Sequence, residues 1–373
     1  MAGIYIHVPF CRKACHYCNF HFSASTRYIN EMVQAIGKEA VLRKHYINEP
    51  AATIYFGGGT PSLLSVSSLH YLLQQLRDSF TIVENAEITL EANPDDIDTE
   101  RLDSWRASGI NRLSIGIQSF NDNDLKWMNR AHNAQQALQS IVLAQQAGFS
   151  NITIDLIYGT PTLTNEQWQR NVQQAIDLDI PHLSCYALTV ELNTALHKMI
   201  ETRKMPNVEE DKQSEHFELL MRWMKDAGYE HYEISNFAKP GCESRHNSSY
   251  WQGKPYLGLG PSAHSFNGTS RQWNIANNAL YMQSIDQGKV PFEIEHLTLI
   301  QQLNEYIMTS LRTQQGISLN RITTQWGEVD SKAIIQDAKQ YIMQGSVVCV
   351  NDHLQLTKSG KLLADGIAAG LFR

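Results

Sequence analysis

The sequence predicts an α/β protein built on a parallel β-sheet. Over the first two thirds of the 373 residues, short apolar segments alternate with segments of helical spacing. This alternation is typical of βαβ units. The expected strands are 3–8, 52–56, 87–91, 112–117, 152–158 and 182–188, and the expected helices are 26–43, 65–80, 99–108, 134–147 and 165–178. Polar residues and glycines follow several of these strands, where ligand sites of parallel sheets lie.

The pattern changes after about residue 240. Residues 240–261 are rich in Gly, Pro, Ser and aromatic residues and predict a structured loop. After it we expect, in order, the helices 296–313, 319–326 and 332–344, a hairpin over 347–356 and a terminal helix. This order predicts a small winged-helix-like α/β domain. We expect three parts in the chain: an α/β domain over 1–240, a connecting segment over 241–290 and the winged-helix-like domain over 291–373.

Charge and composition narrow the classes of function. Lys and Arg number 31 and Asp and Glu 38, a net charge of −7, whereas proteins that mainly bind nucleic acid are usually basic. Residues 293–373 carry seven basic and eight acidic side chains, which argues against DNA binding by the C-terminal domain. No stretch reaches the roughly 20 apolar residues of a membrane helix, and the first residues lack the pattern of a secretory leader. We therefore expect a cytoplasmic protein with reduced cysteines, no transmembrane segment and no nucleic-acid partner.

Three cysteines, Cys11, Cys15 and Cys18, have the spacing Cys-x3-Cys-x2-Cys. Three thiolates can hold a 4Fe–4S cube and leave one iron open for a ligand. A zinc site that uses the thiolates with His16 or His21 is an alternative. A redox pair of Cys15 and Cys18 is another, although it leaves Cys11 without a role.

These residues carry a family resemblance. The segment YIHVPFC at 5–11, the cysteine spacing, the aromatic residue before Cys18 and GGGTP at 57–61 resemble the radical S-adenosylmethionine (SAM) superfamily. More narrowly, nearly the whole chain resembles the oxygen-independent coproporphyrinogen III oxidase family. The resemblance implies a partial (β/α)6 barrel and a 4Fe–4S cluster on the three cysteines. In that family the open iron binds the amino and carboxylate groups of SAM, and reduction of the cluster cleaves SAM to methionine and a 5′-deoxyadenosyl radical.

The same resemblance implies the SAM contacts. Glycines after a strand let backbone N–H groups approach a ligand closely, and polar side chains at strand ends can bind ribose and amino acid groups. For each of them an ordinary turn, strand-end residue or salt bridge is the alternative. The expected SAM-binding residues are Tyr5, Gly58, Gly59, Thr60, Glu91, Gln118, Arg130 and Asp155.

Two differences from the oxidases indicate which branch of the family this sequence resembles. Phe20 stands where the oxidases have a fourth cysteine, and Cys11 comes without the N-terminal extension of the oxidases. Both favour a sister branch, the HemW-type haem chaperones. The segment HNSSYW at 246–251 matches the HNxxYW motif of that branch, which is associated with haem. Imidazole is a good axial ligand of haem iron, so His246 is the expected haem ligand, with His264 as a second candidate. A structural role for His246 is the alternative.

The resemblance implies a haem chaperone with three cofactors or cargoes: a 4Fe–4S cluster, SAM and haem. The expected partners are acceptor haemoproteins such as respiratory enzymes and an electron donor such as flavodoxin or ferredoxin. The alternative is an oxygen-independent coproporphyrinogen III oxidase.

Overall fold

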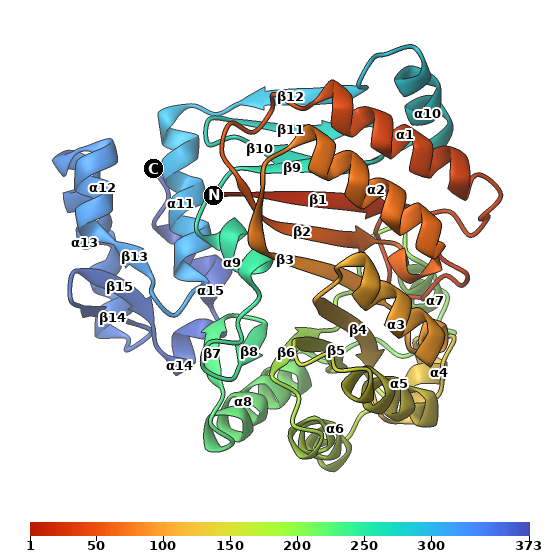
Figure 1. The fold of residues 1–373 in the computed structure, drawn as a ribbon. Coiled ribbons are helices and arrows are strands. Elements are labelled where there is room, and N and C mark those ends of the chain that lie inside the picture. Colours follow the sequence, from red (N-terminus) through yellow and green to blue (C-terminus); the bar gives the residue numbers. More distant parts are fainter.

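The computed structural model describes residues 1–373 and contains one large sheet and one small sheet. Six parallel strands form the centre of the large sheet and follow the chain order, as Figure 1 shows. They are β1 (Ala2–Val8), β2 (Ala51–Gly58), β3 (Ile82–Ala92), β4 (Arg112–Gln118), β5 (Ile152–Tyr158) and β6 (His182–Ala187). The predicted parallel α/β fold is confirmed. The largest difference is the early start of β3, whose first residues include the exposed polar Glu84 and Asn85 and so give a weak strand signal.

Helices connect the strands. In α2, Leu69, Leu72, Leu73 and Leu76 recur at helical spacing, and all four are buried. Ser65 caps the start of this helix, because its side chain accepts the Ser68 N–H and so satisfies a donor of the first turn. The main helices of this part are α1 (Ile29–Leu42), α2 (Val66–Ser79), α3 (Thr99–Ser108), α5 (Ala134–Gln146), α6 (Asn165–Asp177) and α8 (Glu210–Asp226). Shorter helices are η1 (Pro61–Leu63), η2 (Pro94–Asp96), α4 (Asp122–Trp127) and α7 (Ala195–Glu201).

Both edges of the sheet are extended. One edge continues from β6 through β8 (Asn236–Ala238) to β7 (Glu230–Glu233). The other continues from β1 through β9 (Tyr256–Leu259), β10 (His264–Phe266), β11 (Ser270–Asn274) and β12 (Phe292–His296). The added strands β10 to β12 are antiparallel, whereas β9 is parallel to β1. The helix α10 (Asn278–Asp286) lies between β11 and β12 in the chain.

The predicted loop at 240–261 is therefore wrong in part. The structure has helix α9 (Arg245–Trp251) and strand β9 there. The strand is only four residues long and contains Gly258, whose hypothetical Cβ would lie 2.0 Å from the His264 carbonyl oxygen. Such a short strand is stabilised by pairing with β1 and β10, and local residue preferences carry little signal of that pairing.

A buried carboxylate fastens these added strands to α1. The Glu39 side chain is fully buried and accepts hydrogen bonds from Asn274 Nδ2 at 2.8 Å and from the Tyr281 hydroxyl at 2.6 Å. It also accepts the Gly260 N–H at 2.8 Å and pairs with Arg43. Because these partners lie far apart in the sequence, the network fixes β9, β11 and α10 against the barrel.

The C-terminal part has its own core, with buried residues from Leu303 to Leu371. Its helices α11 to α13 precede the hairpin of β14 and β15, which matches the predicted winged-helix-like order, and the short β13 between α11 and α12 completes a three-stranded sheet with the order β13-β15-β14. The predicted domain boundaries themselves stay predictions. The elements are α11 (Leu299–Leu311), β13 (Ile317–Ser318), α12 (Leu319–Trp326), α13 (Glu328–Met343), β14 (Val347–Val350), β15 (His353–Leu356), α14 (Lys358–Lys361) and α15 (Ala364–Gly370).

Side-chain contacts join this domain to the large sheet and to α9. Arg271 on β11 forms an ion pair with Glu305 on α11. The Arg312 guanidinium lies 5.4 Å from the ring centroid of Trp251 on α9. At the other edge, Lys361 Nζ lies 2.8 Å from His231 Nδ1. None of the helices combines the length and the apolar character that crossing a bilayer requires.

Candidate cluster and cofactor site

The three predicted cluster cysteines lie on one loop after β1. Cys11, Cys15 and Cys18 are free thiols, and each is partly exposed. The loop is closed at its base, where Phe10 bridges Ser23 and the Cys11 N–H donates to the Ser23 carbonyl at 3.0 Å. The closed base holds the thiols at the carboxyl end of β1, on the side of the sheet where ligands of parallel sheets bind.

Each of the two histidines of the zinc alternative uses one ring nitrogen in a hydrogen bond within the protein and keeps the other free. His16 Nδ1 lies 2.9 Å from the Trp127 carbonyl oxygen, and His21 Nε2 lies 2.7 Å from Asn278 Oδ1. No three His, Cys, Asp or Glu side chains of the chain converge on a position for one metal ion. A zinc site gathers its ligands around a single ion, whereas a 4Fe–4S cube takes each thiolate on a different iron. Three free thiols on one loop fit the cluster, which takes one thiolate per iron.

Two side chains donate hydrogen bonds to the thiol sulfurs. Arg130 Nη1 donates to Cys15 Sγ at 3.2 Å, and the Thr60 hydroxyl donates to Cys11 Sγ at 3.4 Å. Donors and positive charge beside a cysteine favour its thiolate form, and hydrogen bonds to sulfur tune cluster potentials. The predicted SAM residues Arg130 and Thr60 thus also contact the predicted cluster ligands.

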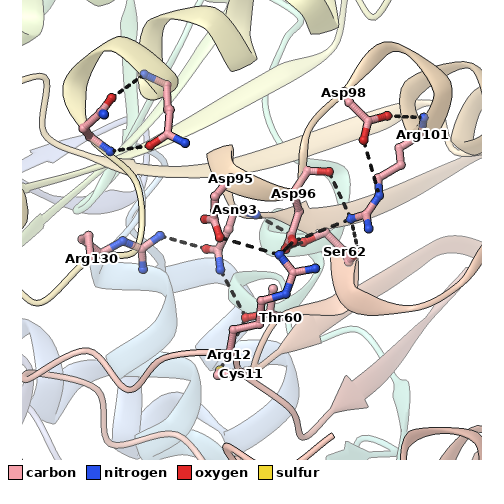
Figure 2. A network of polar contacts seen from close by, with 12 residues as sticks. Cys11, Arg12, Thr60, Ser62, Asn93, Asp95, Asp96, Asp98, Arg101 and Arg130 are labelled. Carbon is pink, nitrogen blue, oxygen red and sulfur yellow. Dashed lines mark hydrogen bonds and ion pairs between the residues drawn. The ribbon is translucent and has the colours of Figure 1, made fainter.

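A polar network joins these two residues, as Figure 2 shows. Arg130 Nη2 donates to Asn93 Oδ1 at 2.8 Å, and Asn93 Nδ2 donates to the Thr60 hydroxyl at 3.3 Å. Arg130 Nη2 also donates to the Gly116 carbonyl at 2.8 Å, while Arg130 Nε is buried without a partner. Asn93 is a site residue that the sequence reasoning missed. Its place directly after β3, two residues beyond Glu91, was the available signal.

A second branch of the network clamps the cysteine loop to the turns after β2 and β3 (Figure 2). Arg12 Nη1 lies 2.7 Å from Asp96 Oδ1, and the Ser62 hydroxyl donates to Asp96 Oδ2 at 2.7 Å. Asp96 is only 3% exposed. The residue after the first cysteine is thus tied to both η1 and η2, which no spacing in the sequence indicates.

The cysteines face a cavity of about 450 Å³ that opens at the carboxyl ends of the strands. Its walls combine the cysteine loop, the glycine turn at the end of β2 and polar residues of β3, β4 and β5. Seven of the eight predicted SAM residues line this cavity: Gly58, Gly59, Thr60, Glu91, Gln118, Arg130 and Asp155. The structure therefore brings together residues that lie as far as 97 positions apart, from Gly58 to Asp155.

The glycines are required by packing as well as by any ligand. A Cβ at Gly59 would lie 2.5 Å from the Phe10 carbonyl oxygen, and the Gly59 N–H already donates to the Val8 carbonyl at 2.9 Å. Gly58 has φ +106°, and its Cβ would lie 2.6 Å from the His7 ring. The Gly59 N–H therefore ties the glycine turn to the end of β1, and the missing side chain lets the turn pack against the Phe10 backbone.

Gln118 has a strained backbone. It ends β4 with φ +65°, a left-handed conformation that is costly for a residue with a side chain. The strand pairing with β5 shifts register between Ile115 and Gln118. The Gln118 side chain makes no hydrogen bond within the protein, although the residue is only 8% exposed. An unpaired amide in strained backbone at a strand end is typical of a residue that meets a ligand.

Two acids with perturbed pKa values face the cavity. Burial raises the pKa of Glu91 to about 8, although a hydrogen bond from the Tyr55 hydroxyl opposes the rise. Burial raises the pKa of Asp155 to about 6, and a hydrogen bond from Ser184 opposes it. A cationic ligand would favour the charged form of both acids.

Tyr5, the eighth predicted SAM residue, lines a different and larger cavity of about 1020 Å³. This second cavity lies between the cysteine loop, α9, the strands β9 to β11 and the helices α11 and α12. Tyr5 and Glu91 nevertheless lie close together, on either side of Gly57. A Cβ built at Gly57 would lie 2.9 Å from the Tyr5 ring and 3.1 Å from Glu91 Oε1. Asn19 and Phe20 line both cavities and stand between them.

His246 is buried on α9, with 1% of its surface exposed. Its Nδ1 lies 2.7 Å from the Thr53 hydroxyl and its Nε2 lies 2.8 Å from the Tyr250 hydroxyl. Its ring stacks on Tyr55 at 5.0 Å. His246 lines neither of the two cavities, so haem ligation by it would require both hydrogen bonds to break. In this geometry the structural alternative is favoured for His246, while Tyr250 faces the larger cavity.

The comparisons with known proteins agree with this arrangement. Residues 5–175 match the family model "Radical SAM superfamily", and residues 297–363 match "HemN C-terminal domain". The fold is similar to that of the radical SAM enzyme coproporphyrinogen III oxidase HemN from Escherichia coli. The TM-score is 0.87 at 24% sequence identity, and the match covers 100% of this chain and 90% of the other.

Curated relatives match at higher identity. The chain is 32% identical to heme chaperone HemW of Bacillus subtilis, over 98% of each protein. It is 33% identical to heme chaperone HemW of Mycobacterium tuberculosis, over 99% of this chain and 94% of the relative. It is 32% identical to that of Haemophilus influenzae, over 96% and 95%. The chain belongs to the HemW family of heme chaperones, within the radical SAM superfamily.

Proposed function

We propose that this protein is a haem chaperone that binds one haem, a 4Fe–4S cluster and SAM, and transfers the haem to acceptor haemoproteins. The observation that carries the proposal is the identity of 31–33% over nearly the full length to several relatives named heme chaperone HemW. Phe20 in place of a fourth cysteine supports the same branch. Respiratory enzymes are the class of acceptor that we propose.

The cluster would be held by Cys11, Cys15 and Cys18. Burial raises the pKa of Cys11 to about 11, and the hydrogen bond from Thr60 and the charge of Arg130 oppose this rise and so favour the thiolate that the cluster needs. The bridge between Phe10 and Ser23 closes the base of the loop, and all three cysteines line the smaller cavity. When bound, the cluster supplies one-electron chemistry and an open iron for a ligand. A low-potential donor such as flavodoxin or ferredoxin is the class of reductant that we propose.

SAM would occupy the smaller cavity. It carries an ammonium group and a sulfonium group as well as a carboxylate, and the cavity offers charges of both signs. Glu91 and Asp155 favour the cationic groups, while the Arg130 guanidinium favours an anion. Gln118 offers an amide without a partner inside the protein, and Arg130 Nε is a buried donor without an acceptor. These unpaired groups support a polar ligand of this kind.

The first experiment combines haem binding and transfer. Anaerobically reconstituted protein titrated with haemin should develop a Soret band that saturates at one haem per chain. Mixing the loaded protein with an apo-haemoprotein should move the band to the acceptor at a rate above that of free haemin. Absence of saturable binding, or transfer no faster than from free haemin, would contradict the proposal.

The second experiment separates the chaperone from the oxidase. Reconstituted protein with coproporphyrinogen III, SAM and a reductant should form no protoporphyrinogen. Escherichia coli coproporphyrinogen III oxidase, which shares the fold, serves as the positive control. Formation of product by this chain at a comparable rate would favour the oxidase over the chaperone.

A further inference from the structure

The cavity of about 1020 Å³ is more than twice the volume of the one beside the cysteines. Pockets of roughly 300–1,000 Å³ are typical of sites for drug-sized ligands and cofactors. Residues of β9 to β11 and of α11 and α12 line this cavity, so both domains contribute to it. In Figure 1, α11 lies beside α9 and the near ends of the strands β9 to β12.

The walls of this cavity expose large apolar side chains. Phe20 on the cysteine loop is 65% exposed, and Leu299 at the start of α11 is 69% exposed. Tyr250 and Trp251 from α9 and Trp326 from α12 add flat aromatic surface. Exposed apolar groups gathered around one cavity indicate a largely apolar ligand. Aromatic rings suit the face of a planar macrocycle.

The histidines near this cavity differ in availability. His7 Nδ1 lies 3.1 Å from the Tyr5 hydroxyl and its Nε2 lies 2.9 Å from the His21 carbonyl, so both nitrogens are engaged. His21 Nε2 is engaged by Asn278. His264 on β10 is exposed, lines the cavity and makes no hydrogen bond through its ring. His264 alone thus presents a ring with two unengaged nitrogens, and the Trp273 ring packs beside it at 6.2 Å.

Two cations stand on the rim. The Arg321 guanidinium stacks over the Tyr306 ring at 4.3 Å, and its only hydrogen bond runs from Nε to Gln325 Oε1 at 3.1 Å. The two terminal nitrogens of Arg321 are therefore free for an anion. Arg271 is paired with Glu305 through Nη2 alone. Guanidinium groups bind carboxylates in bidentate geometry, so this rim suits a ligand with carboxylate arms.

We propose that this cavity is the haem site, with His264 as the axial ligand and with Arg321 and Arg271 on the propionates. The inference rests on the proposed haem binding and assigns its location. It gives the segment at 246–251 a division of roles: Tyr250 and Trp251 form the wall, while His246 positions Tyr250 from behind through the 2.8 Å hydrogen bond.

The axial ligand is tested with glycine variants and added imidazole. In His264→Gly the haem should lose the imidazole signature in magnetic circular dichroism and electron paramagnetic resonance, and imidazole in solution should restore it. His70→Gly, which removes an exposed histidine of α2, controls for unspecific haemin binding. Unchanged spectra in His264→Gly, or rescue by imidazole only in His246→Gly, would overturn the assignment. Circular dichroism and cluster content verify that each variant is folded.

The rim is tested with Arg321→Gln and haem dimethyl ester, in which both propionates are blocked. Haem should bind several-fold more weakly to Arg321→Gln than to the wild type. The dimethyl ester should bind to the two proteins with equal affinity. Arg222→Gln on α8, whose side chain is exposed and unpaired, is the matched control. Equal haem affinity of Arg321→Gln and the wild type would overturn the role of Arg321.

These outcomes are distinguishable from failure of the proposed function. If wild-type protein takes up no haem, the chaperone proposal itself fails. If the wild type binds one haem and the variants at 264 and 321 behave like it, only the location is wrong. Haem ligation by His246 would then require α9 to move away from the sheet. Recovery of the imidazole signature in His246→Gly on addition of imidazole would identify that case.

Discussion

Arg130 donates a hydrogen bond to Cys15 Sγ at 3.2 Å, although 115 positions separate the two residues. The same guanidinium bonds Asn93 and the carbonyl of Gly116, so one side chain ties the cysteine loop to β3 and β4. The cysteine spacing supplies the sulfurs, but this side chain fixes their position relative to the sheet.

Replacement of Arg130 should therefore affect the cluster before it affects the fold. Arg130→Met removes a charge-assisted hydrogen bond to sulfur, a class of bond that contributes about 1.5–3 kcal/mol. We expect reduced iron and sulfide content after reconstitution, and a weaker change of the reduced cluster's electron paramagnetic resonance spectrum on addition of SAM. Arg222→Met should match the wild type in both measurements. Full cluster content together with a normal SAM response in Arg130→Met would contradict this role.

The pH dependence of SAM affinity should follow Glu91. Burial raises the pKa of Glu91 to about 8, so the carboxyl group is mostly protonated in the free protein at neutral pH. A cationic ligand favours the ionised form, so binding should release a proton below pH 8. SAM affinity should rise as the pH increases from 6 to 8 and level off above it, with a contribution from Asp155 near pH 6.

Calorimetry in buffers of different ionisation enthalpy measures this proton release directly. Glu91→Gln should bind SAM more weakly and lose most of the dependence between pH 7 and 8. If the wild type and Glu91→Gln show the same pH profile, Glu91 does not carry the coupling.

His246 should stabilise the fold in its neutral form. Burial lowers the pKa of His246 to about 3, far below the ordinary value of 6.5. The unfolded chain therefore binds a proton at pH 5 that the folded chain does not, and stability contributed by neutral His246 is lost as the pH falls below 6.5. A full proton of difference corresponds to 1.36 kcal/mol per pH unit, and the contribution of His246 is about 1 kcal/mol per unit or less.

Urea unfolding at several pH values checks this expectation. His246→Gln should be less stable at pH 7 by about 1–3 kcal/mol, because the partners Thr53 and Tyr250 lose a buried hydrogen bond. Its stability should fall less steeply between pH 6.5 and pH 5 than that of the wild type. Equal slopes would show that His246 is not held neutral.

Gly59→Ala should disrupt the cysteine loop. Its Cβ would lie 2.5 Å from the Phe10 carbonyl oxygen, and the atoms on both sides are backbone that cannot turn away. We expect strongly reduced cluster content and a lower melting temperature. Gly366→Ala on α15, where a Cβ meets nothing within 4 Å, should be neutral or stabilising by about 0.5–1 kcal/mol. Normal cluster content in Gly59→Ala would contradict the packing explanation.

Much of the site could be predicted because it rests on local patterns. The strands β1 to β6 are short, largely buried segments, with Glu91 and Gln118 near the carboxyl ends of β3 and β4 and Asp155 within β5, and parallel strands present their carboxyl ends on one side. Asn93 and the pair of Arg12 with Asp96 could not be predicted, because the contacts join segments with no common pattern. The strand β9 was missed for the same reason.

The sequence by itself determined the class of this protein: the cysteine spacing, the glycine turn and the alternation of strands and helices follow from residues near each other in the chain. The tertiary structure alone decided which groups are free to act. From the sequence alone, His246 and His264 are both plausible ligands of the haem iron. In the folded chain the first is buried between Thr53 and Tyr250, and the second stands unpaired in the larger cavity. Burial and hydrogen-bond partners depend on distant segments that packing brings together, so no local pattern could distinguish the two imidazoles.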